Sequence, residues 1–277
     1  MTYPWKHGAP RTVFISGGSS GLGLEFARLL AAEGANIAIF NRRLAPQVVA
    51  ELEQLASNTQ QRFASYAADV SDGASLSAAI NAAVAEVGAP TLAINSAGIA
   101  IAAPFDELAE TSFNKVIEVN LIGSRNFAAA VLPHMQAGDH LVLVASIAGL
   151  LPNFAYAAYC ASKYGTVGLA EVLRLEMKLK GIDVSVCCPA EINTPLVEEE
   201  RKTLHPVSAA MKDFVGTMEV GPACHSMLKG IAKRQFEIIP GTMPKLSAWL
   251  NQYVPTVSRG ISDQLAARHM AKHNKKE

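Results

Sequence analysis

Features that would place this 277-residue sequence in several protein classes are scarce or absent. It has four cysteines, Cys160, Cys187, Cys188 and Cys224, and their spacing matches neither a disulfide framework nor a zinc site. We therefore expect free thiols, no metal and a reducing, cytoplasmic setting. Lys and Arg balance Asp and Glu at 24 each, so charge gives no reason to expect nucleic-acid binding. No run of about 18 apolar residues indicates a membrane span, and the N-terminus lacks the apolar core of a signal peptide.

Aromatic residues are also few, at 6%, whereas half of the residues are hydrophobic, a composition typical of a buried sheet covered by Ala- and Leu-rich helices. Short β-branched runs alternate with longer helical patterns, which predicts a parallel sheet with right-handed crossovers in one α/β domain over 1–277. The predicted strands are 12–16, 36–40, 62–67, 91–95, 140–146, 183–187 and 236–239. The predicted helices are 21–33, 46–56, 73–87, 110–135, 156–180 and 222–233.

Two stretches depart from this alternation after the core of residues 11–190. Residues 191–219 are polar and irregular, and they follow a predicted strand. Residues 242–277 form a C-terminal extension that begins with an aromatic-bearing segment and ends in a basic tail, whose last residues we expect to fray.

A glycine-rich turn, SGGSSGLG at 16–23, joins the first predicted strand to the first predicted helix. Glycines let backbone N–H groups approach a diphosphate, and the helix that follows directs its positive end at the same anion. The spacing is G-x-x-x-G-x-G rather than G-x-G-x-x-G, and an ordinary strand–helix turn is the alternative. Its position favours a dinucleotide, with contacts expected from Gly17, Ser19, Ser20, Gly21 and Leu22.

Two arginines, Arg42 and Arg43, follow the second predicted strand. NAD-binding folds usually place an acid here to bind the ribose 2′-hydroxyl, whereas an arginine accommodates the 2′-phosphate of NADP. Guanidinium groups bind phosphate through charge-assisted, forked hydrogen bonds. A pair of solvated surface cations is the alternative, but this turn lies where the adenosine end of the cofactor should sit. The sequence therefore predicts NADP(H).

Two further predicted strands end in residues that suit a cofactor. Asp69 follows the third strand, and it either binds the adenine amino group or caps the next helix. Ser71 and Asp72 are the other candidates for that helix cap. The fourth strand ends in NSAG at 95–98, small residues of the kind that a wall close to a cofactor requires.

Tyr159 and Lys163 lie four residues apart in a helical pattern and therefore share a face. A nearby ammonium lowers the pKa of a tyrosine from about 10, which makes such a pair a workable proton donor and acceptor. Ser146 ends the preceding strand and offers a hydroxyl to orient a carbonyl oxygen. Asn120 is a mediocre helix former inside a helical pattern. It is a helix irregularity or a buried structural amide, or it fixes a water that passes protons to Lys163.

The sequence resembles the short-chain dehydrogenase/reductase family over about residues 11–240. The resemblance is carried by five features in this order: SGGSSGLG at 16–23, NSAG at 95–98, Asn120, Ser146 and YCASK at 159–163. The resemblance implies a Rossmann-type, doubly wound sheet of seven parallel strands with helices on both faces. It implies a catalytic set of Asn120, Ser146, Tyr159 and Lys163, in which Tyr159 protonates the carbonyl oxygen. It also favours adenine contact by Asp69. Further cofactor contacts are expected from Val70, Asn95, Ala97, Gly98, Tyr159, Lys163, Pro189, Ile192 and Thr194.

Two positions depart from the family pattern. Ser16 replaces the usual Thr and keeps the hydroxyl, and Ala190 follows Pro189 where the family usually has Gly. The second departure concerns the geometry of the loop on the nicotinamide side.

A narrower resemblance is to 3-ketodihydrosphingosine (3-dehydrosphinganine) reductases. It is carried by GGSSG at 17–21, Arg42, GLAE at 168–171, and Thr194-Pro195 followed by EEER at 198–201. It implies reduction of a long-chain 3-keto amine to the alcohol. A steroid, a sugar or a 3-oxoacyl substrate is the alternative, because fold and catalytic residues do not decide among them. A non-catalytic NADP(H)-binding regulator is a more distant alternative.

The resemblance to the short-chain dehydrogenase/reductase family suggests that residues 191–219 form a mobile substrate flap and that long helices at 110–135 and 156–180 build a homodimer or homotetramer. Glutamates 198–200 could attract a substrate ammonium, although a solvated helix face is the simpler explanation. Helical spacing also gives the extension one apolar face. That face packs on the core or a subunit, lines an acyl-chain channel, or rests on a membrane with the basic tail on lipid headgroups. Its residues are Leu246, Trp249, Leu250, Tyr253 and Val254.

Overall fold

The computed structural model describes residues 3–194, 197, 201 and 204–273. At its centre is a seven-stranded sheet in the order β3-β2-β1-β4-β5-β6-β9, with parallel neighbours throughout. The strand order reverses between β1 and β4, which confirms the predicted doubly wound sheet and leaves a crevice beyond the carboxyl ends of these strands. The strands are β1 Thr12–Ser16, β2 Asn36–Asn41, β3 Phe63–Ala67, β4 Leu92–Asn95, β5 His140–Val144, β6 Asp183–Cys187 and β9 Glu237–Ile238.

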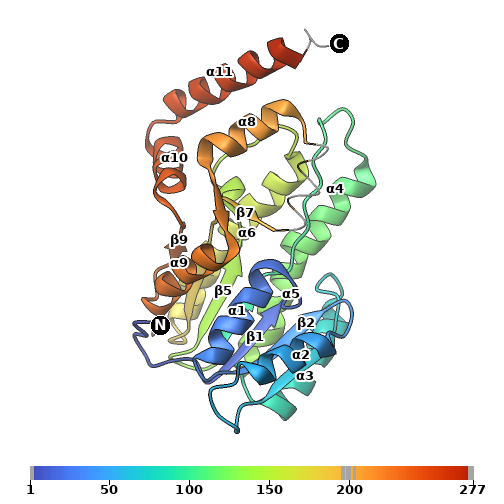
Figure 1. Ribbon diagram of the computed structural model, residues 1–277, viewed down its shortest axis with the longest axis vertical. Helices are drawn as coiled ribbons and strands as arrows, with labels where there is room; N and C mark the ends of the chain where they lie inside the picture. The colour runs from blue at the N-terminus through green and yellow to red at the C-terminus, as the bar shows by residue number, and fades with distance from the viewer. Residues whose placement is uncertain (1–2, 195–196, 198–200, 202–203, 274–277) are drawn as a thin grey trace.

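Side chains that alternate along β1 enter two separate cores, one on each face of the sheet. Val13 and Ile15 pack with α1 (Gly21–Ala32), α2 (Pro46–Gln54) and α9 (Val220–Ala232). Phe14 packs on the other face with α3 (Gly73–Val87), α5 (Gly123–Val131) and α6 (Ala157–Lys178). Strands buried on both faces read as continuous apolar runs, as TVFIS does here. The prediction of helices on both faces is confirmed (Figure 1).

The helical pattern predicted over 110–135 is confirmed as a run of helical turns over 110–134, but the type of helix changes within it. It consists of α4 (Glu110–Ile117), a π-helical turn (Glu118–Ile122), α5 and a 3₁₀ turn (Leu132–His134). The fully buried Asn120 lies in the π-helical turn and bonds to the backbone of Ile99 in the loop after β4. Single π-turns inside helices are frequent at functional sites.

The described residues between 191 and 219 form regular elements that the sequence does not indicate. β7 (Glu191–Asn193) and β8 (Thr217–Glu219) pair in parallel as a second, small sheet, and α8 (Pro206–Val215) lies between them in the chain. α8 starts with a proline at its first position and is capped by the His205 side chain, which accepts the Val207 N–H at 3.2 Å. Three-residue strands are too short to show a period of two, so the prediction of irregular structure was wrong for a physical reason.

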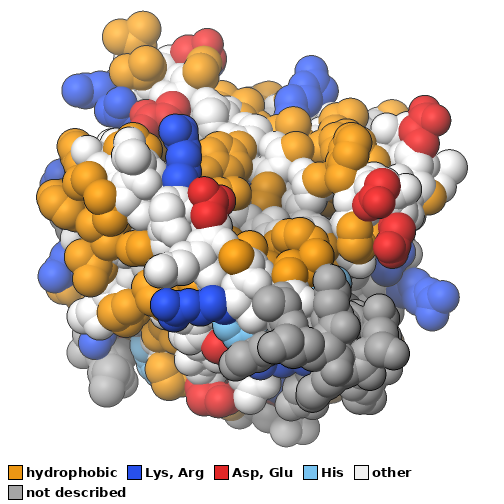
Figure 2. Space-filling view, turned by 90° about the horizontal axis from the view of Figure 1, so that it is seen from above, with side chains coloured by type: hydrophobic (Ala, Val, Ile, Leu, Met, Phe, Trp, Pro, Cys, Tyr) orange, Lys and Arg blue, Asp and Glu red, His pale blue; other side chains and the backbone are white. Residues whose placement is uncertain are grey.

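The C-terminal extension forms two helices, α10 (Thr242–Tyr253) and α11 (Pro255–His273). Both contact α8, and α11 lies across it at the end of the molecule farthest from the bulk of the sheet (Figure 1). Figure 2 looks down on this end, where groups of hydrophobic side chains surround a hollow. Among the helices that the structure describes, none is long and apolar enough to cross a membrane.

Candidate active site

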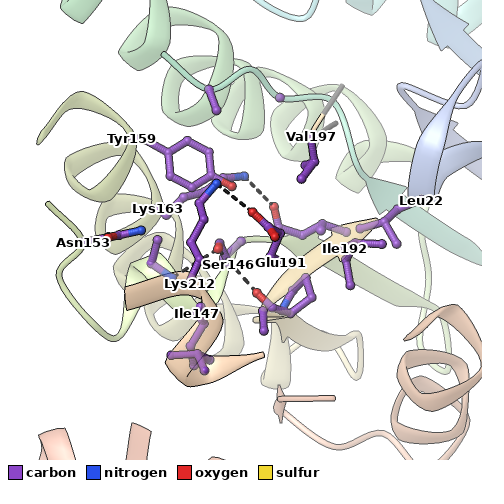
Figure 3. Close-up of a pocket in the computed structure, with 18 of the residues that line it drawn as sticks. Leu22, Ser146, Ile147, Asn153, Tyr159, Lys163, Glu191, Ile192, Val197 and Lys212 are labelled. Atoms are coloured by element: carbon purple, nitrogen blue, oxygen red, sulfur yellow. Dashed lines mark hydrogen bonds and ion pairs between the residues drawn. The ribbon is translucent and has the colours of Figure 1, made fainter. Parts of the chain in front are cut away.

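A cavity of about 790 Å³ lies beyond the carboxyl ends of the central strands and extends to α8, α10 and α11. It brings together the glycine-rich turn, the residues after β4 and β5, the first turns of α6 and the segment that starts at β7 (Figure 3). Of the residues predicted from the sequence, those that line it are Gly17, Ser19, Ser20, Gly21, Leu22, Ala97, Gly98, Ser146, Tyr159, Lys163, Pro189, Ile192 and Thr194.

The glycine-rich turn is packed tightly on one side and open on the other. Gly17 and Gly21 have φ values of +67° and +52°, which a residue with a side chain rarely adopts. A Cβ atom on Gly17 would lie 2.9 Å from the backbone of Ala97, and one on Gly23 would overlap the carbonyl oxygen of Gly17. A Cβ on Gly21, by contrast, would meet nothing nearer than Thr194 Cγ2 at 3.8 Å. The backbone at Gly21 therefore faces the cavity.

The N-terminus of α1 fits an anionic group. Ser20 occupies the N-cap position without a capping hydrogen bond from its side chain, and the first turn carries no acidic residue. The backbone N–H groups of a first helical turn have no partner within the helix, and the helix dipole adds a positive potential there. The diphosphate of a dinucleotide suits this geometry.

Asn41, the last residue of β2, holds the glycine-rich turn and was not predicted from the sequence. Its Oδ1 accepts the N–H of Ser19 at 3.0 Å. Its Nδ2 is buried and has no hydrogen-bond partner among the described residues. The only signal in the sequence is its position, immediately before Arg42 at the end of the second strand.

Asn95 does not line the cavity but holds Ser16, the residue at which the glycine-rich turn begins. Its Oδ1 accepts the Ser16 hydroxyl at 2.5 Å, and its Nδ2 donates to Ser124 Oγ at 2.8 Å. Ser16 Oγ in turn accepts the N–H of Ala97 at 3.2 Å. The hydroxyl that Ser16 keeps in place of the usual Thr therefore joins β1 to the residues after β4.

The remaining predicted cofactor contacts lie at the edge of the crevice, outside the cavity lining. Arg42 and Arg43 are exposed, whereas Val70 is buried. The carboxylate of Asp69 accepts the N–H and the hydroxyl of Ser71 at 2.9 and 2.6 Å. These hydrogen bonds, and more weakly the charges of Lys115 and Arg42, lower the pKa of Asp69.

Asp69 does not cap the next helix, α3. Asp72 caps α3 by accepting the N–H groups of Ala74 and Ser75. Adenine contact by Asp69 stays a prediction.

Three of the four predicted catalytic residues meet on the cavity wall (Figure 3). Tyr159 and Lys163 lie on successive turns of α6, and Lys163 Nζ is 5.5 Å from the centre of the Tyr159 ring. Nζ also donates to the carbonyl of Val144 at 3.0 Å. Burial lowers the pKa of Lys163 from 10.5 to about 8. Ser146 follows β5, accepts the N–H of Ala148 at 3.1 Å and donates to the carbonyl of Pro189 at 3.4 Å.

Asn120, the fourth, lies behind this wall. Its Oδ1 accepts the Ile99 N–H at 2.8 Å, and its Nδ2 donates to the Ile99 carbonyl at 2.9 Å and to Ser162 Oγ at 3.0 Å. A Cβ on Gly98 would lie 3.3 Å from Asn120 Oδ1 and 3.6 Å from Lys163 Nζ, so these two side chains flank Gly98. Asn120 is thus both a helix irregularity and a buried structural amide, and its part in a proton relay stays a prediction.

A buried ion network, which the sequence analysis missed, closes one side of the cavity. The side chain of Glu191 is only 4% exposed. It accepts hydrogen bonds from both Nε and an Nη of Arg201, and from Thr217 Oγ1 at 2.9 Å, while Lys212 Nζ lies 2.9 Å from its second oxygen. Burial raises the pKa of Glu191, but the hydrogen bonds from Arg201, Lys212 and Thr217 outweigh it and lower the pKa overall. Glutamates 198–200 and Pro195 lie outside the described residues.

The apolar face predicted for the extension is divided between two environments. Leu250 lines the cavity together with Ile261 and Leu265 of α11. The other predicted members of that face are exposed to solvent, so the five residues do not share one environment. They are Leu246, Trp249, Tyr253 and Val254.

Comparisons with known proteins agree with this geometry. The family model for short chain dehydrogenases matches residues 11–205. The 3-dehydrosphinganine reductase TSC10B of Arabidopsis thaliana is 35% identical over 238 residues, which cover 83% of this chain and 69% of the relative. The D-beta-hydroxybutyrate dehydrogenase of Cupriavidus necator is 30% identical over 212 residues, which cover 74% of this chain and 81% of the relative.

Solved structures share the fold. The short chain dehydrogenase/reductase of Burkholderia phymatum, solved in complex with NAD, superposes with a TM-score of 0.75 at 24% identity, covering 89% of this chain and 94% of that one. The sequence match, the sheet order and the side chains gathered at the crevice lead to one conclusion. The chain belongs to the short-chain dehydrogenase family of oxidoreductases.

Proposed function

We propose that this protein is an NADP(H)-dependent reductase that converts a long-chain 3-keto amine, such as 3-ketodihydrosphingosine, into the corresponding alcohol. The observation that carries the proposal is one continuous cavity. It joins the glycine-rich turn and Tyr159 at one end to apolar side chains of α8, α10 and α11 at the other. The names of several relatives, 3-dehydrosphinganine or 3-ketodihydrosphingosine reductase, support the substrate class.

The chain's own residues supply orientation and the proton. A bound nicotinamide provides the hydride that reduces the carbonyl carbon. The Ser146 hydroxyl orients the carbonyl oxygen, and the Tyr159 hydroxyl donates the proton to it. With a pKa of about 8, Lys163 is mostly an ammonium at neutral pH, and its charge beside the Tyr159 ring stabilises the phenolate that proton transfer leaves. The Asn120 carboxamide holds the backbone of Ile99, next to Gly98, where Lys163 packs.

The preference for NADP(H) rests on the residues at the end of β2. Arg42 and Arg43 are exposed cations at the crevice edge, and Asn41 occupies the last position of the strand. The Nδ2 of Asn41 has no partner among the described residues and is a donor, which suits phosphate oxygens. A ribose 2′-hydroxyl in an NAD enzyme is instead bound by an acidic acceptor.

The substrate class rests on the apolar end of the cavity. Its volume lies within the range of small-molecule sites, roughly 300–1,000 Å³, and its lining includes both Tyr159 and residues of α11, which suits a chain that extends from one to the other. Burial of each methylene contributes about 0.8 kcal/mol, so long chains bind more tightly than short ones. The apolar side chains at this end are Met211, Phe214, Val215, Leu250, Ile261 and Leu265.

The proposal is tested by steady-state turnover with NADPH and NADH against a panel of carbonyl compounds. The panel contains dispersed 3-ketodihydrosphingosine, a short-chain 3-keto amine, a steroid ketone, a keto sugar and a 3-oxoacyl thioester. We expect the highest kcat/KM for NADPH with the long-chain 3-keto amine. Efficient turnover of water-soluble ketones, with none of the long-chain compound, would refute the substrate but leave the reductase standing. Cofactor binding without turnover of any compound would favour the non-catalytic regulator.

A homodimer through α4, α5 and α6 belongs to the same proposal. Apolar side chains are exposed along this surface, and exposed apolar patches often mark protein contacts. The mass in solution, measured by light scattering, tests it, and Val172→Glu together with Leu175→Glu should yield a monomer. The exposed residues are Ile122, Tyr164, Val172 and Leu175.

A further inference from the structure

The outer side of α10 carries large apolar side chains with nothing from the described chain covering them. Leu246, Trp249 and Tyr253 are 49%, 52% and 63% exposed, and they follow one another at spacings of three and four residues, so they form one stripe. The rings of Trp249 and Tyr253 lie 5.6 Å apart, centre to centre. Aromatic side chains with a polar tip are typical of surfaces that contact the boundary between water and lipid.

The stripe lies beside the cavity rather than remote from it. On the same helix, Ser247 and Leu250 line the cavity, as Ile261 and Leu265 of α11 do. The outer surface and the cavity therefore share one wall, made of α10 and α11. Figure 2 views this end of the molecule, where hydrophobic side chains surround the hollow and both cationic and acidic side chains are scattered among them.

The charge of the extension complements an anionic surface. Residues 242–277 contain six Lys and Arg residues against Asp263 and Glu277, a net charge of +4. The whole chain has a net charge of zero, so the other residues sum to −4. A segment whose sequence combines an excess of basic residues with exposed Trp, Tyr and Leu side chains is typical of one that lies in the membrane interface. The cations are Lys245, Arg259, Arg268, Lys272, Lys275 and Lys276.

We propose that α10 and α11 dock this protein on an anionic lipid bilayer, with the stripe of Leu246, Trp249 and Tyr253 in the interface. A second copy of the chain fits this surface less well, because it would bring the same excess of positive charge against itself. The dimer proposed above uses the apolar surface of α6 instead.

Docking would place the apolar end of the cavity next to the lipid. A long-chain substrate could then reach Tyr159 without passing through water. This consequence rests on the proposed substrate, whereas the docking itself does not.

Vesicle binding without substrate tests the docking separately from the reaction. The chain has two tryptophans, so Trp5→Phe leaves Trp249 as the only tryptophan reporter. Vesicles of phosphatidylcholine alone are compared with an equimolar mixture of phosphatidylcholine and phosphatidylglycerol. We expect flotation with the mixed vesicles only, a blue shift of Trp249 emission, and weaker binding at high salt because counterions screen the headgroups. Lack of binding to the mixed vesicles would overturn the proposal.

Variants separate docking from other effects. Leu246→Gln with Tyr253→Gln should weaken binding to mixed vesicles at least tenfold, because each buried side chain contributes roughly a tenfold factor. The matched control is Leu179→Gln, a change at a 91% exposed leucine at the end of α6, before β6 begins. Neither set should alter the reduction of a water-soluble ketone. Unchanged vesicle binding in the double variant, or a change of its mass in solution instead, would refute docking through this stripe.

Discussion

Lys163 Nζ lies 5.5 Å from the centre of the Tyr159 ring and donates a hydrogen bond to the carbonyl of Val144. The residues are one helical turn apart on α6, and both line the cavity. Because Lys163 is buried, its charge lies in a medium that screens it less than water does. The arrangement therefore gives the two side chains separate tasks, proton transfer and charge stabilisation, which can be tested one at a time.

Removal of the Tyr159 hydroxyl should abolish the proton transfer and spare the cofactor. For Tyr159→Phe we expect a loss of about 10²- to 10⁴-fold in kcat, since general acid catalysis contributes that much. The dissociation constant of NADPH, measured by fluorescence titration, should remain almost unchanged. Retention of most of the turnover would contradict the assignment of Tyr159 as the proton donor. Lys163→Ala should damage turnover and cofactor binding together, because Lys163 stabilises the Tyr159 phenolate and, as we propose, also holds the nicotinamide ribose.

The burial of Lys163 predicts a stability that depends on pH. Its pKa is about 8 in the folded chain and near 10.5 when unfolded. Below pH 8 both states are protonated and the folded state carries the full cost of a buried charge. Between the two values the unfolded state binds more protons, so the free energy of unfolding rises with pH. A shift of this size corresponds to roughly 3 kcal/mol.

Lys163→Met should therefore stabilise the cofactor-free protein at neutral pH. The gain should be about 2 kcal/mol, because the lost hydrogen bond to Val144 offsets about 1 kcal/mol. Above pH 10.5 the variant should have no advantage. Urea unfolding followed by circular dichroism at both pH values measures the difference. Parallel pH profiles for the two proteins would mean that the buried ammonium costs nothing.

Replacement of Arg42 by Asp should reverse the cofactor preference. The change removes a cation and adds an acceptor for the ribose 2′-hydroxyl, so kcat/KM should fall about 10- to 100-fold for NADPH and hold or rise for NADH. Asn41→Asp should act in the same direction, because it removes the buried Nδ2 donor. Arg11→Asp, an exposed change just before β1, is the matched control. Equal affinity of the unmodified protein for both cofactors would contradict the assignment.

The parts of the fold that could be predicted are those in which local pattern and packing agree. β1 is buried on both faces, so TVFIS reads as a continuous apolar run, and the turn that follows needs glycine at Gly17 and Gly21 for backbone reasons. Tyr159 and Lys163 share a face because the helical period fixes their spacing. Each of these features is specified by residues near one another in the chain.

The features that could not be predicted depend on residues far apart in the sequence. The carboxylate of Glu191 is engaged by Arg201, Lys212 and Thr217, and no spacing rule joins these positions. Asn41 gains its role only when β2 lies beside β1, which places it against Ser19. Both the exposed and the cavity-facing side of α10 carry large apolar side chains, so the helical period alone could not separate Leu250 from Trp249.

The ion network around Glu191 should hold α8 over the cavity, and Lys212→Met tests this. Removal of one partner of a buried charge is destabilising by about 3–5 kcal/mol when no other partner remains. Because Arg201 and Thr217 still engage Glu191, we expect about 2 kcal/mol here. The loss should be local, with faster amide exchange in α8 and β8 and a rise in KM larger than the fall in kcat.

The matched control is Lys229→Met, which removes an exposed cation of α9. The pKa of Glu191 is lowered in the folded chain, so its ionised form stabilises the fold above the usual carboxyl range, and that contribution is lost as the pH falls through the folded-state pKa. Glu191→Gln should therefore flatten the acid limb of the stability profile. The double variant, Glu191→Gln with Lys212→Met, should lose less stability than the sum of the losses in the two single variants, since each single change already breaks the same pair. If amide exchange in α8 were as slow in Lys212→Met as in the control Lys229→Met, the pair of Glu191 and Lys212 would not hold the helix in place.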